Sequence, residues 1–332
     1  MTTARRTLTR ADLAPLTRAA LGPSRILTGV ERLRGGTKKG VYRLTLDDDS
    51  TAIAYVWSAD EDYWDQPDPD PRDVFSHGTG LGLFTAAHDR LAAAGVRTPR
   101  LLHADSTHTH LPADAAVVED MTGGSLEEAL ARDPEGAPEA MERMAELLAT
   151  LHSRTGPRFG KVAVVDKGGS SHGVSCEQRI TEGALRCIAE AAARDPRAAA
   201  ARRELEEEIH ALAAEVRPRD DRHTLVHGEL GADHVLLTPD GQPALIDIEG
   251  LMYFDVEHEH VFLRLRFGPH YDALRAPGLD EARLRLYRLS MHIGLVSGPL
   301  TLIEGDFPHP GRMRDIAEHN LHQALSLLKS AS

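Results

Sequence analysis

Short apolar runs separated by turn residues occupy the first part of the chain. Three of them lie within about residues 25–57 and read RILTGVERLRGG, GVYRLTL and STAIAYVW. Such runs, bounded by glycines and a DDDS segment, predict strands, as do RLLHAD and AAVVED further along. Between the two groups, LGLFTAAHDRLAAAGV predicts a helix. Its apolar residues recur on one helical face, at Leu83, Ala87, Leu91 and Ala94.

The apolar positions take a helical period from about Ser125 onward. Ser125 stands three residues before Glu128, which is the capping-box pattern of a helix start. APEAMERMAELLATLHS predicts a helix from apolar residues at Met141, Met144, Leu147, Leu148 and Leu151. Further helices are expected within residues 177–216, 279–295 and 313–329. Between them, HVLLT and PALID flank a PDGQ turn and predict a β-hairpin.

This change of pattern predicts an α+β protein with two lobes, and 332 residues are enough to build both. A small lobe built on an antiparallel β-sheet is expected at residues 1–120. A larger, mostly helical lobe that contains the hairpin is expected at residues 121–332. The segment EDMTGG would link the two.

Composition narrows the class of protein. With 41% hydrophobic and 27% charged residues and no apolar stretch of 18 residues, the chain reads as globular without a membrane span. Its first residues lack the apolar core of a secretory signal, and Cys176 and Cys187 form no disulfide or CxxC pattern, so a cytoplasmic location is expected. The net charge of -13 argues against a nucleic-acid partner. It would suit a cationic ligand, although acidic balance is common without one.

Five segments, in order, resemble the aminoglycoside phosphotransferase and choline kinase-like family, which has the two-lobed protein-kinase-like fold. HGELGADH resembles the family's catalytic loop, in which Asn follows His-Gly-Asp by five residues, and LIDIEG resembles its metal-binding strand end. GVRTPRLLHAD, VVEDMTGGSLEEAL and MAELLATLH resemble the strand after the first helix, the interlobe hinge and the helix beneath it. The resemblance implies a nucleotide-binding lobe at residues 1–120 and a catalytic and substrate-binding lobe at residues 121–332.

The resemblance also implies roles for the loop and strand residues. Phosphoryl transfer needs an acceptor for the hydroxyl proton and a metal that neutralises phosphate charge. Glu229 matches the base, and His227 opens the same motif, as catalytic machinery or as a hydrogen-bonded brace of the loop. Asp247 matches the Mg²⁺ ligand. His234 is a further ligand or a loop anchor, and Glu249, expected on the same strand face as Asp247, is a second-metal or outer ligand.

The nucleotide would be held by the hinge and by a glycine-rich turn. The hinge, with Glu119 and Met121, is expected to bind adenine through its backbone. The strand TAIAYVW lacks the family's phosphate-binding lysine, and the following helix lacks the glutamate that pairs with it. The turn RGGTKKGVYR offers a substitute, in which phosphates would be cradled by Gly35, Gly36, Lys38 and Lys39.

Two catalytic-loop positions differ from the family's pattern. Glu229 replaces the catalytic Asp, and one added methylene moves the carboxylate by about an ångström. His234 replaces the metal-binding Asn, and imidazole is a poor Mg²⁺ ligand.

Two acidic segments each allow two interpretations. Residues 255–260, DVEHEH, are a metal cluster or, as the resemblance implies, part of a helix beneath the active site with Asp255 bracing the catalytic loop. The loop at residues 60–73 is a solvated flap or a lid in which Tyr63 and Trp64 close over a ligand.

The favoured interpretation is a kinase that uses ATP or GTP with Mg²⁺ and phosphorylates a hydroxyl of a small molecule, such as an aminoglycoside or another natural product or metabolite. The altered signature positions favour an alternative, a catalytically silent kinase-fold protein that binds nucleotide or a protein partner as a scaffold. A third interpretation is another nucleotide-dependent transfer. Carboxylates at both Glu229 and Asp247 favour the kinase.

Overall fold

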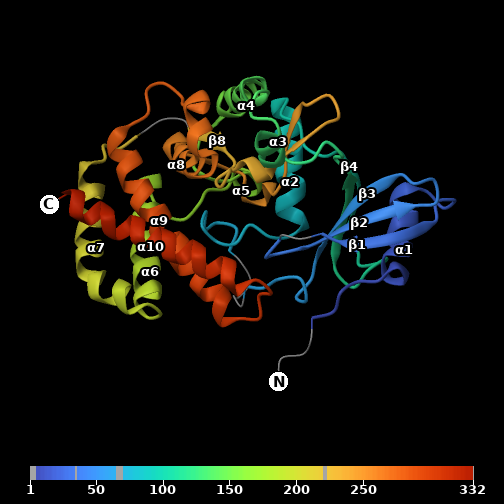
Figure 1. The fold of residues 1–332 in the computed structure, drawn as a ribbon, viewed down its shortest axis with the longest axis horizontal. Coiled ribbons are helices and arrows are strands. Elements are labelled where there is room, and N and C mark those ends of the chain that lie inside the picture. The colour runs from blue at the N-terminus through green and yellow to red at the C-terminus, as the bar shows by residue number, and fades with distance from the viewer. Residues whose placement is uncertain (1–4, 34–35, 65–69, 220–222, 332) are drawn as a thin grey trace. The chain divides into compact units, whose positions relative to one another are not determined.

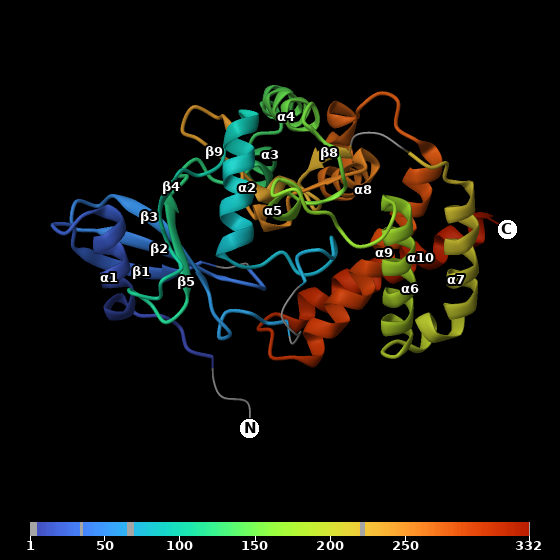
Figure 2. The same ribbon diagram turned by 180° about the vertical axis from the view of Figure 1, so that it is seen from behind.

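The computed structural model describes residues 5–33, 36–64, 70–219 and 223–331, drawn from two sides in Figures 1 and 2. Its contacts divide the chain into two compact units. Unit 1 comprises Met1–Pro69, His77–Leu147 and Ala232–Gly250, and unit 2 comprises Asp70–Ser76, Leu148–Gly231 and Leu251–Ser332. The expected lobe boundary near residue 120 stays a prediction.

Unit 1 is built around a five-stranded antiparallel sheet with the strand order β1-β2-β3-β5-β4. The structure confirms all five predicted strands. They are β1 (Leu27–Arg32), β2 (Gly40–Leu46), β3 (Thr51–Trp57), β4 (Leu101–Asp105) and β5 (Asp114–Glu119).

The strand β3 is buried on both faces, which explains why its apolar run does not alternate with polar residues. Ala54 and Val56 belong to the core that the sheet shares with the N-terminal helix. On the other face, the rings of Tyr55 and Trp57 lie 5.5 and 5.6 Å from the ring of Phe84, between centroids. Phe84 belongs to α2 (Leu81–Ala94), the helix predicted there.

Helix α1 (Arg10–Leu21) is absent from the predicted elements. It begins with a capping box in which Thr9 N donates to Asp12 Oδ2 at 2.8 Å and the Thr9 side chain accepts from Asp12 N. Leu13 and Leu16 bury its inner face against the sheet. The signal is weak in sequence because Asp12 replaces the usual Glu and Pro15 interrupts the helix pattern.

The hairpin of unit 1 consists of β9 (Val235–Leu237) and β10 (Pro243–Leu245), flanked by the 3₁₀ turns η1 (Ala232–His234) and η2 (Ile248–Gly250). Two backbone hydrogen bonds tie it to the rest of the unit. Leu237 N donates to Gly124 O and Leu245 N donates to Arg97 O, both at 2.9 Å. Gly124 precedes the capping box of α3 (Leu126–Arg132), as predicted, and α4 (Ala137–His152) follows.

Unit 2 holds the predicted helices and a small sheet that the sequence does not predict. The sheet has the order β6-β8-β11-β7, formed by Thr155–Gly156, His223–Val226, Met252–Phe254 and Gly160–Lys161. Strands of two to four residues are too short to show a period. The helices are α5 (Val162–Val165), α6 (Cys176–Ala192), α7 (Pro196–Glu215), α8 (Val256–Phe267), α9 (Glu281–Glu304) and α10 (Pro310–Ala331), with the 3₁₀ turn η3 (Gly268–Leu274).

Helices α6, α7, α9 and α10 pack side by side in unit 2 (Figure 1). Within the described parts of the chain, no helix combines the length and the apolar character needed to cross a bilayer.

His258 lies among aromatic rings in the core of unit 2. It is 7% exposed, and its ring centroid lies 5.3 Å from that of Phe254 and 5.4 Å from that of Phe262. Its Nδ1 finds no hydrogen-bond partner among the described residues. Burial lowers the pKa of His258 to about 4, so the folded protein keeps this ring neutral in mild acid.

We predict that His258→Phe makes the protein less sensitive to acid. As the pH falls below about 6.5, the unfolded chain binds a proton at His258, while the folded chain does so only near its lowered pKa. The wild type should therefore lose about 2 kcal/mol more of its free energy of unfolding between pH 7 and pH 5 than the variant does. Urea unfolding at both pH values measures this loss, with His210→Gln, a change at an exposed histidine, as control. Equal losses in wild type and His258→Phe would contradict the prediction.

Candidate functional site

A buried lysine joins the two carboxylates that follow the hairpin in unit 1. Lys39 Nζ donates to Asp247 Oδ1 at 2.7 Å and to Glu249 Oε1 at 2.6 Å. Lys39 and Glu249 are 7% and 3% exposed, whereas the side chain of Asp247 is 43% exposed. The ammonium also lies 5.3 Å from the ring centroid of Tyr55 on β3. Three residues predicted for separate roles therefore meet as one ion cluster.

The expectation that Asp247 and Glu249 share a strand face is wrong. Strand β10 ends at Leu245, and Asp247 has a left-handed backbone with φ of 58°. Asp is one of the few residues that adopt this region readily. The turn and the following η2 helix, rather than strand alternation, bring both carboxylates to Lys39.

The hairpin register places His234 beside Asp247. Ile246 N donates to His234 O at 3.0 Å, which aligns the ends of the two hairpin arms. His234 Nε2 then lies 3.8 Å from Asp247 Oδ2. The two oxygens of Asp247 therefore face different nitrogen groups, the ammonium of Lys39 and the imidazole of His234.

A close backbone approach holds η2 in place. A Cβ atom at Gly78 would lie 2.9 Å from Gly250 N, so only glycine fits this contact. The next residue, Thr79, donates through Oγ1 to Lys38 O at 3.2 Å. Residues 78–79 thus touch both the segment that carries Lys39 and the segment that carries Glu249.

The charges of this cluster reinforce one another. Burial alone would lower the pKa of Lys39, but Asp247 and Glu249 outweigh burial and raise it. The Lys39 charge in turn lowers the pKa of Asp247 well below its usual range, against the effect of burial. Lys39 and Asp247 therefore each favour the charged form of the other.

The glycine-rich turn and the hinge supply the other predicted nucleotide residues. Gly35 lies outside the described residues. Gly36 has a φ of 75°, and a Cβ there would lie 2.7 Å from Lys39 O, so glycine is required. Lys38 is partly exposed, unlike Lys39. In the hinge, Glu119 N donates to Arg100 O at 2.9 Å, and the side chain of Met121 is 6% exposed.

The loop at residues 227–230 of unit 2, predicted to be the catalytic loop, is held by Glu259, not by Asp255 as expected. The buried carboxylate of Glu259 accepts from three loop amides: His227 N, Gly228 N at 3.3 Å and Leu230 N at 3.4 Å. Glu259 reaches them because β8, which leads into the loop, pairs with β11, which leads into α8. Burial raises the pKa of Glu259, and the three amides and His227 act in the opposite direction.

Glu229 occupies the centre of this loop in unit 2. The residue is only partly buried, and its backbone carbonyl accepts from Arg266 Nη1 at 3.0 Å. His227 is 1% exposed. The backbone is therefore held by hydrogen bonds on both sides of Glu229.

Asp255 belongs instead to a buried ion cluster of unit 2. It accepts from Arg283 at 2.6 Å, from Tyr287 Oη at 2.5 Å and from Arg219 at 3.2 Å. Arg219 also pairs with Glu257 at 2.9 Å. Asp255 and Glu257 thus share Arg219, while Glu259 turns to the loop amides. The interpretation of residues 255–260 as a metal cluster stays a prediction.

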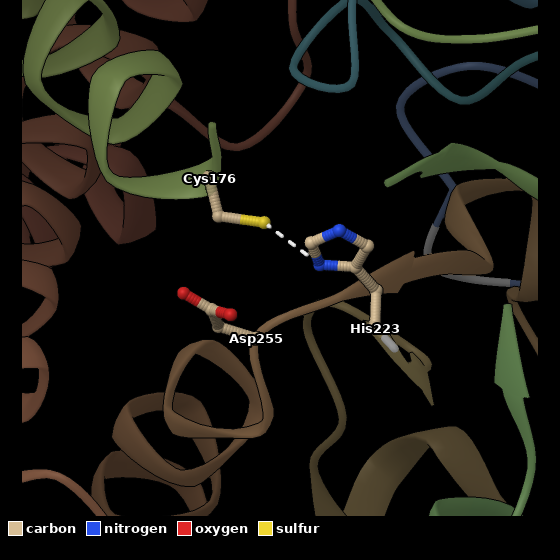
Figure 3. Close-up of side chains that lie close together, drawn as sticks. All are labelled: Cys176, His223 and Asp255. Atoms are coloured by element: carbon tan, nitrogen blue, oxygen red, sulfur yellow. Dashed lines mark hydrogen bonds between the residues drawn. The ribbon is translucent and has the colours of Figure 1, made fainter. Parts of the chain in front are cut away.

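A second set of candidate ligands consists of Cys176, His223 and Asp255, whose ligand atoms lie within 4.8 Å of one another (Figure 3). Cys176 Sγ lies 3.5 Å from His223 Nδ1. Burial, followed by the charge of Asp255, raises the pKa of the Cys176 thiol well above its usual value. The Asp255 carboxylate already binds two guanidinium groups, which favours a structural hydrogen-bonded cluster over a metal site.

The aromatic residues of the acidic loop have partners within unit 1. Trp64 Nε1 donates to Thr37 Oγ1 at 2.9 Å, and the ring of Trp64 lies 4.3 Å from that of His77. The guanidinium of Arg5 lies 4.2 Å from the ring centroid of Tyr63. The lid interpretation stays a prediction, and residues 65–69 of this loop lie outside the described residues.

The sequence model of the phosphotransferase enzyme family, APH, matches residues 29–291 of this chain. The chain belongs to this family. The match to this family model confirms the resemblance inferred from the sequence motifs of the loop and the hairpin. No curated protein sequence matches the chain.

Solved structures show the same fold. A thermostable mutant of aminoglycoside phosphotransferase APH(4)-Ia, in ternary complex with AMP-PNP and hygromycin B, is 15% identical, with a TM-score of 0.64 over 97% of this chain and 99% of that chain. APH(2")-IIia in complex with GDP and kanamycin is 15% identical, with a TM-score of 0.58 over 95% and 97%. A putative fructosamine-3-kinase from Thermobifida fusca YX-ER1 is 18% identical, with a TM-score of 0.56 over 96% and 100%. The predicted α+β, protein-kinase-like fold is confirmed.

We predict that Glu259→Ala loosens the catalytic loop. The variant leaves three buried or partly buried amides without their acceptor, and an orphaned buried donor costs about 1–3 kcal/mol. The free energy of unfolding should fall by at least about 2 kcal/mol, and the loop amides should exchange hydrogen faster. Denaturant unfolding and amide exchange measure both effects. Glu207→Ala, at an exposed position of α7, is the control and should change stability by less than about 0.5 kcal/mol. Unchanged exchange at residues 227–230 would refute the brace.

Proposed function

We propose that this protein is a small-molecule kinase that transfers the γ-phosphoryl group of ATP or GTP to a hydroxyl of its acceptor. The cluster of Lys39, Asp247 and Glu249 is the observation that carries the proposal. A buried ammonium offers a partner for phosphate oxygens, and two carboxylates offer ligands for the metal that accompanies a nucleotide. Membership of a phosphotransferase family supports the same chemistry.

The carboxylates of the cluster fit Mg²⁺, which prefers oxygen ligands and takes one or two from protein. Asp247 is half-exposed and would be the direct ligand. Glu249 Oε2 is buried without a hydrogen-bond partner among the described residues, so it has a free acceptor to offer. His234 fits less well as a direct ligand, because imidazole suits softer metals, and we assign it to orienting Asp247. When bound, Mg²⁺ would neutralise phosphate charge.

Glu229 would act as the base. Its carboxylate accepts the proton of the acceptor hydroxyl while the hydroxyl oxygen bonds to the γ-phosphorus. The bond from that phosphorus to the βγ-bridging oxygen breaks, and its electron pair leaves with the nucleoside diphosphate. Lys39 would contact the transferred phosphate in place of the lysine that β3 lacks, with Lys38 and Gly36 beside it. Glu259 supports this step indirectly by fixing the backbone around Glu229.

The hinge and the acceptor complete the proposal. Glu119 ends the strand β5 and Met121 follows two residues later, and both would present backbone groups to the base of the nucleotide. The acceptor would be an aminoglycoside-like natural product or another metabolite with a hydroxyl group, and the acidic balance of the chain suits a cationic one. Hygromycin B and kanamycin, bound by the neighbouring structures, and fructosamines are the first compounds to test.

A catalytically silent, nucleotide-binding scaffold is the second candidate. Glu229 and His234 at the positions of the family's Asp and Asn, together with a strand β3 without lysine, favour it. It differs from the kinase in a measurable way, because a scaffold binds nucleotide but forms no phosphorylated product.

We predict that Glu229→Gln abolishes transfer while nucleotide binding persists. Losing the proton acceptor should lower kcat by about 100-fold or more, since a general base contributes about 10²- to 10⁴-fold. Glu229→Asp keeps a carboxylate and should retain part of the activity. Release of ADP or GDP, measured with the acceptor panel, and mass spectrometry of the product test both variants. A wild type that binds nucleotide yet phosphorylates no acceptor would favour the scaffold, and full activity in Glu229→Gln would exclude Glu229 as the base.

A further inference from the structure

We propose that Lys39 is a resident cation that closes Asp247 and Glu249 to divalent metal until a nucleotide phosphate draws the ammonium away. Metal binding would then follow nucleotide binding. The inference rests on the proposed kinase function for the identity of the releasing ligand. Its first half, competition between Lys39 and metal, concerns unit 1 alone.

The ammonium occupies the space that a metal would need. Its nitrogen lies 2.7 Å from Asp247 Oδ1 and 2.6 Å from Glu249 Oε1, between the two carboxylates. Mg²⁺ binds carboxylate oxygens at about 2.0–2.1 Å, so an ion shared by these oxygens cannot coexist with the nitrogen there. The other oxygen of Asp247 faces His234 at 3.8 Å. Binding of one metal ion to both Asp247 Oδ1 and Glu249 Oε1 therefore requires that Lys39 leaves.

Without nucleotide, the two carboxylates bind the Lys39 ammonium in preference to a metal ion. Its ammonium is tethered beside two buried or half-buried anions and lies near the ring of Tyr55. Removing it without a replacement partner would leave a desolvated charge, which costs several kcal/mol. Mg²⁺ must in addition give up water, which it does reluctantly. Two carboxylates alone do not offset both costs.

A nucleotide changes both sides of this balance. Its phosphates provide a new anionic partner for the ammonium and additional oxygens for the metal. Lys39 can move to such a partner because it lies just outside the β2 ladder, whose first pair with β3 is Gly40 with Val56. Its departure exposes the carboxylates, including the unpartnered Glu249 Oε2. Lys39 would thus pair with the two carboxylates before nucleotide binds and with the nucleotide phosphate afterwards.

The test measures Mn²⁺ binding by the electron paramagnetic resonance signal of free Mn²⁺, with no nucleotide present. The full chain is compared as wild type, Lys39→Met and Lys167→Met, the last removing an exposed lysine of unit 2 as a matched control. Lys39→Met should bind Mn²⁺ at least about tenfold more tightly than the wild type, and Lys167→Met should match the wild type. Adding Asp247→Asn to Lys39→Met should remove the gain. Far-UV circular dichroism checks folding, and Lys39→Gln replaces Lys39→Met if that variant does not fold.

Equal Mn²⁺ affinity in the wild type and the folded Lys39 variant would overturn the proposal. So would a gain that survives Asp247→Asn, because the ion would then bind elsewhere. The second half is tested by calorimetry of the wild type with AMP-PNP, where Mn²⁺ affinity of the protein–nucleotide complex should exceed that of the free protein by at least tenfold. Nucleotide that binds without this effect overturns the release step. A failure of all forms to bind nucleotide contradicts the kinase function instead, and the nucleotide-free comparison distinguishes the two failures.

Discussion

Buried negative charge beside the hairpin is the constraint on which the site depends. The buried Glu249 lies beside the half-exposed Asp247 just after strand β10, and a buried carboxylate without a cation would cost several kcal/mol. Lys39 meets that requirement from a segment more than 200 residues earlier in the chain. The cluster therefore fixes the start of β2 and the η2 turn against each other, and Gly78 and Thr79 pack where the two segments meet.

Unit 2 satisfies its buried charges in a similar way and thereby fixes the loop at residues 227–230. Glu259 accepts from loop amides, and Asp255 pairs with two arginines and a tyrosine. Both carboxylates lie at the start of α8, directly after β11. Strand β8 leads into the loop and β11 leads into α8. Because β11 pairs with β8, the backbone pairing itself places the start of α8 beside the loop. The backbone of the loop that carries Glu229 is thus held by hydrogen bonds, as the proposed role of Glu229 as a base would require.

Local pattern predicts most of the fold. The strands of unit 1, the hairpin and the long helices each have a period or a cap that is visible in sequence, as Ser125 and Glu128 illustrate. Helix α1 is not predicted because Asp12 and Pro15 weaken its helix signal. The strands β6, β7, β8 and β11 are not predicted because they are too short to show a periodic pattern. Candidate residues for the site can be named from the sequence, but their contacts cannot. Nothing local in sequence indicates that Lys39 pairs with Asp247, that the left-handed backbone at Asp247 replaces strand alternation, or that Glu259 rather than Asp255 braces the loop.

The most direct test of the account is thermal and chemical unfolding of the wild type and Asp247→Asn with ATP or GTP, each with and without Mg²⁺. A ligand at about 100 times its Kd stabilises a protein by about 2.7 kcal/mol, which such experiments resolve readily. If Lys39, Asp247 and Glu249 form the phosphate and metal centre, nucleotide should stabilise the wild type and Mg²⁺ should increase that effect. Asp247→Asn should lose the Mg²⁺-dependent part alone. An identical Mg²⁺ response in both proteins would contradict the account, because the metal would then bind without the carboxylate on which the site is built.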